Sequence, residues 1–255
     1  MTRGTIVMIH GFGTGGWVWE GYSDLLERQG FDCLALDLPY RSTGDEAPPQ
    51  QLGLLGISDY LSYLEREIAS LEEEPILMAH SAGTLMAQLL AAKGLARAAV
   101  LLTPVPPAGI SALNRNAMKL GGSILRTWGF WRKPVRVTFD ELVFAALHLS
   151  TPQEQQRVHE RFGYDSGRLF LQMALSLVNP RSSMRVDASQ VTCPVLIVAG
   201  EQDQTTPPPV ARKIAEKYGA DYLEFEGHAH WPLGEPGWEV IAQKCADWMI
   251  SLKND

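Results

Sequence analysis

The stretch ILMAHSAGTLMAQLL, residues 76–90, passes from a short apolar run into a helical pattern through a sharp turn. The run Ile76–Ala79 is typical of a buried strand, and Ser81 stands at the turn. The residues two before and two after this serine, Ala79 and Gly83, are small. This is the G-x-S-x-G pattern with Ala in place of the first Gly, in which a strained turn lifts the serine hydroxyl above the sheet edge. The stretch therefore predicts a strand, a nucleophile elbow and a helix.

A helix N-cap is the simpler interpretation of Ser81, because serine is common at that position. Two observations favour the elbow. The flanking residues are small, and the free N–H groups at the helix start, beginning with Ala82, would point to where a developing oxyanion lies.

Similar short apolar runs alternate with helical patterns on both sides of this unit. The predicted strands are Thr5–Ile9, Phe31–Leu36, Pro75–Ala79, Ala98–Thr103, Val195–Ala199 and Tyr222–Phe225. The predicted helices are Trp19–Arg28, Ile57–Leu71, Ser81–Lys93, Val210–Tyr218 and Trp238–Leu252. This alternation predicts βαβ units and an α/β fold with a doubly wound, mostly parallel sheet of about six strands.

The 87 residues from Pro104 to Gln190 interrupt this alternation and contain no convincing strand. Because an unstructured loop of that length is improbable in a compact domain, we expect a helical insertion. Its candidate helices are Ser111–Leu125, Phe139–Leu149, Pro152–Arg161 and Gly167–Val178. We therefore predict a core domain of residues 1–103 and 191–255, and a helical cap of residues 104–190 over the sheet.

Composition narrows the class of protein. The chain has 255 residues, of which 45% are hydrophobic, and its net charge is −7 without a marked run of Lys or Arg. These values exclude a disordered chain and argue against nucleic acid and anionic membranes as partners. The absence of a long apolar segment argues against membrane insertion. Three widely spaced cysteines and the lack of a signal-peptide pattern predict free thiols and a cytoplasmic location.

A glycine-rich loop, IHGFGTGG at residues 9–16, follows the first predicted strand. Such a loop lies near the carboxyl edge of the sheet, where the N–H of Phe12 could serve as an oxyanion donor. An alternative interpretation is nucleotide binding. GFGTGG matches G-x-G-x-x-G, and Asp37 follows the second strand at the distance expected for a ribose contact.

Two further loops supply an acid and a base. Asp203 follows the strand in VLIVAGEQDQTTPP, residues 195–208, and His230 follows the strand in YLEFEGHAHWPLGEPGW, residues 222–238. A serine needs a base to accept its proton, and imidazole suits that role at neutral pH when a carboxylate fixes its tautomer. The chain order Ser81, Asp203, His230 is that of hydrolases with a nucleophile elbow.

Over nearly its whole length the chain resembles α/β-hydrolase fold enzymes of the esterase/lipase-like group with a helical cap. In that family the acid follows a Gly-x-x-Asp pattern, which matches Asp203 and leaves Glu201 as a distant second. The family's histidine is followed five residues later by an acidic residue. His230 has Glu235 at that spacing, whereas His228 has it seven residues away, so the resemblance favours His230 as the base.

The resemblance implies a carboxylesterase-like enzyme that acts on a small-molecule ester without a metal or organic cofactor. Ser81 would attack the ester carbonyl, His230 would take its proton and Asp203 would orient the imidazole. The N–H groups of Phe12 and Ala82 would form the oxyanion hole.

The cap's aromatic side chains suggest an apolar pocket for a small substrate, and we expect Trp128 and Trp231 to contact it. Other interpretations remain open at this point. The same triad could hydrolyse a carbon–carbon bond, a lactone or an amide, and the chain could be a ligand-sensing protein on a hydrolase scaffold. The nucleotide-binding oxidoreductase is the third alternative.

Overall fold

The computed structural model describes residues 2–41, 43–44, 46–111, 119, 121–176, 179 and 182–252. Its centre is a parallel sheet of six strands in the order β2-β1-β3-β4-β7-β8. The strands are β1 (Thr5–Ile9), β2 (Asp32–Leu36), β3 (Ile76–His80), β4 (Ala98–Leu102), β7 (Val195–Gly200) and β8 (Asp221–Phe225). The predicted α/β fold and its six strands are confirmed, with boundaries shifted by one residue at most.

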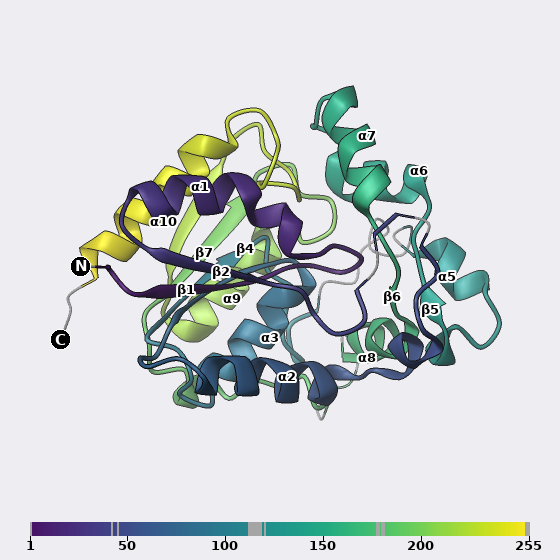
Figure 1. Cartoon of the computed structure of the whole chain (residues 1–255), viewed down its shortest axis with the longest axis horizontal. Helices are drawn as coiled ribbons and strands as arrows, with labels where there is room; N and C mark the ends of the chain where they lie inside the picture. The colour runs from purple at the N-terminus through teal and green to yellow at the C-terminus, as the bar shows by residue number, and fades with distance from the viewer. Residues whose placement is uncertain are drawn as a thin grey trace.

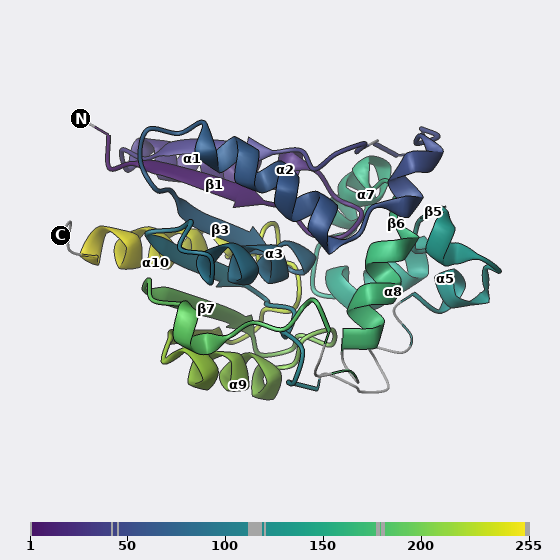
Figure 2. The same cartoon turned by 90° about the horizontal axis from the view of Figure 1, so that it is seen from below.

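Helices cover both faces of the sheet (Figures 1 and 2). On one face lie α1 (Glu20–Arg28) and α10 (Trp238–Ser251), and on the other lie α2 (Ile57–Ala69), α3 (Ala82–Ala91) and α9 (Pro208–Tyr218). Side chains of a strand alternate between these two layers. In β1, Ile6 and Met8 pack in the core under α1 and α10, whereas Val7 and Ile9 pack in the core under α2, α3 and α9.

The insertion between β4 and β7 lies beyond the carboxyl ends of the strands, at the right of Figure 1. Its described helices are α5 (Gly122–Arg126), η3 (Phe130–Arg132), α6 (Phe139–Leu142), the π-helix η4 (Val143–Leu147), α7 (Pro152–Arg161) and α8 (Gly167–Ser176). Further 3-10 turns are η1 (Gly16–Trp19) and η2 (Gln50–Leu54) in the core, and η5 (Ala188–Gln190) at the end of the insertion. The insertion is largely helical, as expected, and its status as a separate cap domain of residues 104–190 stays a prediction.

One detail of the insertion differs from expectation. It contains a small antiparallel sheet of β5 (Pro134–Val135) and β6 (Asp165–Ser166), although no strand was predicted. Strands of two residues are too short to show the alternation by which strands are recognised. The helix predicted at 111–125 falls largely on residues 112–118 and 120, which lie outside the described part of the chain; α5 overlaps only its end.

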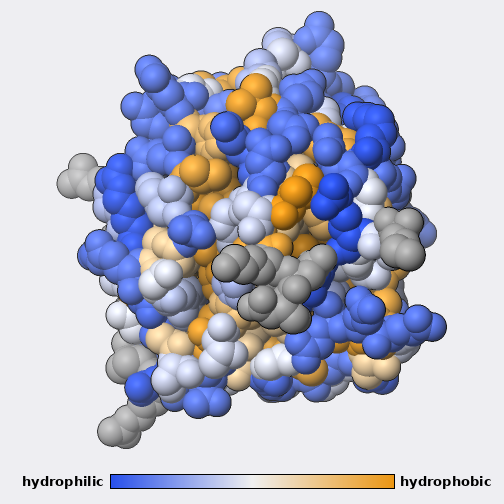
Figure 3. All heavy atoms as spheres, turned by 90° about the vertical axis from the view of Figure 1, so that its left-hand side faces the viewer, coloured by the Kyte–Doolittle hydropathy of each residue, from blue (hydrophilic) through white to orange (hydrophobic). Residues whose placement is uncertain are grey.

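The surface opposite the insertion is mainly hydrophilic. Figure 3 shows this face, where blue side chains surround smaller orange hydrophobic areas. Within the described residues, the structure has no helix with the length and apolar character that crossing a bilayer requires.

Candidate active site

Ser81 occupies a strained turn between β3 and α3. Its φ of 49° and ψ of −121° place it in a region that non-glycine residues rarely adopt. The close approach of strand and helix explains the small residue at 83: a Cβ there would lie 2.5 Å from the carbonyl oxygens of Ile9 and His10. The Ser81 side chain makes no N-cap hydrogen bond, so the capping interpretation does not describe this residue.

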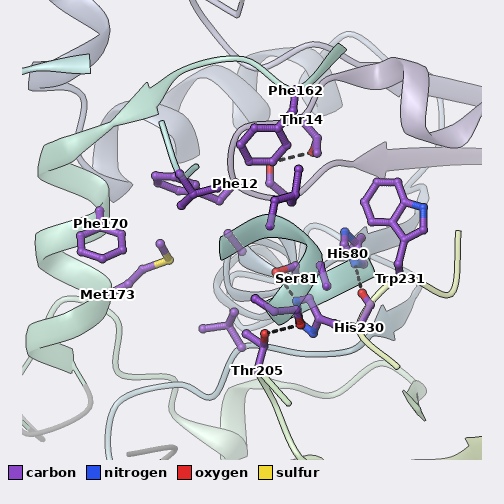
Figure 4. A pocket seen from close by; sticks show the side chains of 17 residues that line it. Phe12, Thr14, His80, Ser81, Phe162, Phe170, Met173, Thr205, His230 and Trp231 are labelled. Carbon is purple, nitrogen blue, oxygen red and sulfur yellow. Dashed lines mark hydrogen bonds between the residues drawn. The ribbon is translucent and has the colours of Figure 1, made fainter. Parts of the chain in front are cut away.

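The hydroxyl of Ser81 lies instead beside an imidazole. Its Oγ is 2.8 Å from Nε2 of His230 (Figure 4). Nδ1 of His230 is 2.8 Å from Oδ2 of Asp203. The other oxygen of Asp203 accepts hydrogen bonds of 2.8 Å from the N–H groups of Thr205 and Thr206, which fix the carboxylate. Three loops that follow β3, β7 and β8 thus bring a hydroxyl, an imidazole and a carboxylate into one line.

The alternative base and acid lie elsewhere. Nδ1 of His228 is 3.1 Å from Oε2 of Glu235, a buried carboxylate that also accepts the N–H groups of Ala229 and Trp231. Burial raises the pKa of Glu235. Glu201 is exposed, and its carboxylate accepts the N–H of Gly227. The structure therefore brings His230 and Asp203 to Ser81, and neither His228 nor Glu201.

A second histidine supports the loop that carries His230. His80 is 3% exposed, and burial together with the neighbouring His230 lowers its pKa to about 3. It is therefore neutral at neutral pH, and its Nε2 lies 2.8 Å from the carbonyl oxygen of His230. The imidazole N–H can donate to that carbonyl and hold the loop in place. The sequence placed His80 beside the serine but gave no sign of this contact.

Phe12 and Ala82 lie at the same cavity as Ser81. Within the described residues, neither backbone N–H donates to a protein acceptor. Ala82 is the first residue of α3, where N–H groups have no partner within the helix. Both donors are thus available to an oxygen placed near the serine.

The cavity is apolar and has a volume of about 130 Å³. Figure 4 shows Phe170 and Met173 on α8 facing Ser81 and His230 across it. Its apolar side chains from the insertion are Val105, Val137, Leu142, Ala145, Ala146, Phe162, Phe170 and Met173. Sequence reasoning did not find these individual residues, because the aromatic content of the insertion does not reveal which side chains face the sheet.

The two tryptophans predicted at the pocket behave differently. Trp231 lines the cavity and is 2% exposed, whereas Trp128 is 86% exposed and does not line it. Trp128 packs edge-on against Trp131, with ring centroids 5.6 Å apart, at the outer side of the insertion. The prediction for Trp128 is thus corrected, because the short turn that carries it points away from the sheet.

The insertion contacts the loops that carry the polar groups of the site. Oγ1 of Thr205, two residues after Asp203, donates to the carbonyl oxygen of Ala145 in the π-helix at 2.9 Å. Nε1 of Trp231 donates to Oε1 of Glu154 in α7 at 3.0 Å. Core and insertion thus form the site together.

The glycine-rich loop also bears on the nucleotide interpretation. Asp37, which that interpretation assigns to a ribose, accepts a hydrogen bond from the N–H of Gly16 at 2.7 Å and so holds the loop itself.

In the described part of the chain, no group of three or more His, Cys, Asp or Glu residues is arranged to hold a metal ion.

The six-stranded parallel sheet flanked by helices is the fold of the α/β-hydrolases. The family model described as "Alpha/beta hydrolase family" matches residues 6–243, so the chain belongs to this family and is a hydrolase. A comparison with curated proteins found no match.

Several solved structures share the fold. The monoacylglycerol lipase of Paleococcus ferrophilus is 22% identical with a TM-score of 0.73, covering 98% of this chain and 95% of that one. Polyneuridine aldehyde esterase is 17% identical with a TM-score of 0.70, covering 97% and 99%. A pyrethroid hydrolase from Sphingobium faniae is 18% identical with a TM-score of 0.68, covering 97% of both chains. At these identities the likeness establishes the fold.

Proposed function

We propose that this hydrolase cleaves carboxylic esters of small, largely apolar substrates through a Ser81-His230-Asp203 triad. One observation carries the proposal. The imidazole of His230 lies between the hydroxyl of Ser81 and the carboxylate of Asp203, at 2.8 Å from each. That geometry allows proton transfer from the serine while the carboxylate fixes the tautomer and stabilises the imidazolium.

The reaction would proceed in two halves. Oγ of Ser81 attacks the ester carbonyl while Nε2 of His230 accepts its proton. The imidazolium then protonates the departing alcohol, and an acyl-enzyme remains. In the second half His230 removes a proton from water, which attacks the acyl carbonyl. The bond to Oγ of Ser81 then breaks, the imidazolium returns the proton to Oγ, and the acid leaves.

The tetrahedral oxyanion of both halves would accept the N–H groups of Phe12 and Ala82. Both residues line the cavity with Ser81, and neither N–H has a protein acceptor within the described residues. Each donor of this kind contributes about 10²–10³ to the rate.

The substrate class follows from the cavity. An apolar cavity of about 150 Å³ holds a molecule the size of benzene, so the 130 Å³ next to Ser81 suits a short acyl group or a small ring. The side chains that the insertion contributes are hydrophobic, which favours an uncharged substrate. Two structural neighbours, a monoacylglycerol lipase and an esterase, are consistent with ester cleavage.

A fluorophosphonate probe tests the nucleophile directly, with intact mass as the readout. We expect the wild-type chain to gain one phosphonyl group and the Ser81→Ala variant to gain none. Hydrolysis of short-chain p-nitrophenyl esters, measured beside a lactone, an amide and a β-diketone, then identifies the bond. An unlabelled wild-type chain, or equal labelling of both chains, would reject the proposal.

A further inference from the structure

Asp165 is a buried carboxylate of the insertion whose two oxygens are fully used. Its side chain is 0% exposed. Oδ2 accepts the N–H of Gly13 at 2.8 Å and pairs with Nη1 of Arg41 at 2.9 Å. Oδ1 accepts the N–H of Ser166 at 2.6 Å and the hydroxyl of Tyr60 at 3.3 Å. A carboxylate with four donors on four sides is tightly fixed in position.

Gly13 is the residue of the core that this carboxylate holds. The insertion contacts it a second time, because the N–H of Gly163 donates to the carbonyl oxygen of Gly13 at 2.8 Å. The φ of Gly13 is +71°, and a Cβ there would lie 2.2 Å from the ring of Phe162. Both backbone polar groups of Gly13 are therefore bound by the insertion, in a conformation and a space that suit glycine alone.

The residue next to Gly13 is Phe12, whose N–H is the first of the two oxyanion donors in the proposed function. The Phe12 N–H itself belongs to the preceding peptide unit, between Gly11 and Phe12, whose carbonyl oxygen accepts a hydrogen bond from the Thr14 hydroxyl at 3.0 Å. Gly13 acts on the Phe12 N–H through the Cα of Phe12: the hydrogen bonds at Gly13 restrict movement of that Cα, and the ring of Phe12 packs against Phe170 with centroids 5.9 Å apart. A donor shifted by about 1 Å can cost about 10²-fold in rate.

Arg41 neutralises the charge of the buried Asp165 carboxylate. A buried negative charge behind the loop would oppose the negative charge of an oxyanion, and Arg41 compensates it. The Arg41 side chain is 5% exposed and also donates to the carbonyl oxygen of Tyr164 at 3.3 Å. Burial works against its charge, but Asp165 more than offsets this and raises the pKa of the guanidinium.

We propose that Asp165 is a positioning residue for the oxyanion hole: its carboxylate, neutralised by Arg41, fixes Gly13 and thereby the direction of the Phe12 N–H. The inference rests on the proposed function, because it assigns the oxyanion hole to the loop at residues 11–13. It also assigns the insertion a part in the chemical step besides lining the cavity.

Two double variants distinguish the hydrogen bond that residue 165 accepts from the Gly13 N–H from the ion pair between Arg41 and Asp165. Asp165→Leu with Arg41→Met replaces the buried pair by apolar groups, a change that often preserves stability. Asp165→Asn with Arg41→Met removes the same charges but leaves an acceptor oxygen for the Gly13 N–H. We expect the first variant to lose about 10–100-fold in kcat with a KM within about threefold. The second should recover most of that loss.

The inhibitor readout separates positioning from general loosening. A trifluoromethyl ketone forms a tetrahedral oxyanion adduct with a serine, whereas the matching methyl ketone binds largely without one. The Asp165→Leu double variant should lose affinity for the former by the same factor as kcat and keep its affinity for the latter. Arg161→Gln, which breaks the exposed ion pair with Glu20, serves as the control and should keep wild-type kcat.

Several outcomes would overturn the inference. Equal kcat in the wild type and both double variants would leave Asp165 a purely structural residue. Equal losses with Leu and Asn would assign the effect to the ion pair. If neither variant folds, amide exchange of the wild type labelled with ¹⁵N-glycine decides, because an unprotected Gly13 N–H excludes the contact. Failure of the wild type to hydrolyse esters would instead reject the proposed function, while the exchange measurement would still test the Gly13 contact.

Discussion

His228 and His230 lie two residues apart in the loop that follows β8, and each contacts a carboxylate. In one pair Nδ1 of His230 contacts Asp203, and in the other Nδ1 of His228 contacts Glu235. All four side chains are buried. The pairs differ at the other ring nitrogen: Nε2 of His230 reaches Oγ of Ser81. The ring of His228 instead packs edge-on against Phe225, with centroids 6.2 Å apart.

The carboxylates differ as well. Asp203 comes from a neighbouring strand, so its contact with His230 joins the loops that follow β7 and β8. Glu235 belongs to the same loop as His228 and accepts the backbone N–H groups on both sides of His230. A histidine beside a carboxylate is thus not enough to define a base. The pair with His230 contacts Ser81, the proposed nucleophile, whereas the pair with His228 holds the backbone on both sides of His230.

Replacing each of the two histidines by alanine should give the largest difference in kcat/KM. We expect His230→Ala to lower kcat/KM for a p-nitrophenyl ester by about 10⁴-fold, because no group remains to accept the proton of Ser81. His228→Ala should stay within about fivefold of the wild type, since His228 does not contact the serine. Steady-state kinetics with active-site titration measures both. A larger loss with His228→Ala would reverse the assignment.

Replacing each of the two carboxylates by its amide should give a smaller difference, in which one variant loses activity and the other loses stability. Asp203→Asn should lower kcat by about 10³–10⁴-fold with little change in stability, because the imidazole loses the partner that fixes its tautomer. Glu235→Gln should instead lower the free energy of unfolding by about 1–3 kcal/mol, because an amide cannot accept on both of its ends.

Urea unfolding and kcat of the folded fraction distinguish these two variants. The folded Glu235→Gln chain should keep kcat within about tenfold of the wild type, because its effect on His230 passes through the backbone. A severe loss of kcat with unchanged stability would show that Glu235 belongs with the reacting groups.

A pH-dependent effect concerns His80, whose Nε2 contacts the carbonyl oxygen of His230. Its pKa of about 3 in the folded chain lies below the ordinary value of 6.5, so the unfolded chain takes up a proton first as the pH falls. Below pH 6.5 this residue should therefore reduce stability by about 1.4 kcal/mol per pH unit, down to its folded pKa.

Urea titrations between pH 6.5 and 4 measure that slope. The His80→Gln variant cannot take up this proton, so its stability should fall less steeply than that of the wild type. Parallel slopes for the two chains would show that the folded chain protonates His80 readily. In that case the histidine would not hold the loop as a neutral donor.

The sequence predicted the core well because each element of the core carries a local signal. Buried strands are continuous apolar runs, and Gly219 ends α9 in the left-handed conformation that favours glycine. The loops that follow parallel strands lie at one edge of the sheet. The three side chains of the proposed triad could therefore be selected because each of them directly follows a strand. Their convergence required no knowledge of distances.

The insertion was harder to predict because its signals are not local. The side chains that line the cavity belong to short helices whose orientation depends on packing against the sheet. Trp128 shows the error that results, since an aromatic residue in the right segment faces solvent. The pairing of Arg41 with Asp165 joins residues far apart in the chain, and neither carries a pattern that names the other.

The contacts of the insertion set a condition for exchanging it between relatives. Gly13, Thr205 and Trp231 each bind the insertion by a hydrogen bond, and each lies within three residues of a group assigned to the reaction. A transplanted segment that fills the same space but lacks these partners would reshape all three loops at once. A segment grafted into this chain to alter its substrate range should therefore keep Asp165, Glu154 and the carbonyl oxygen at position 145.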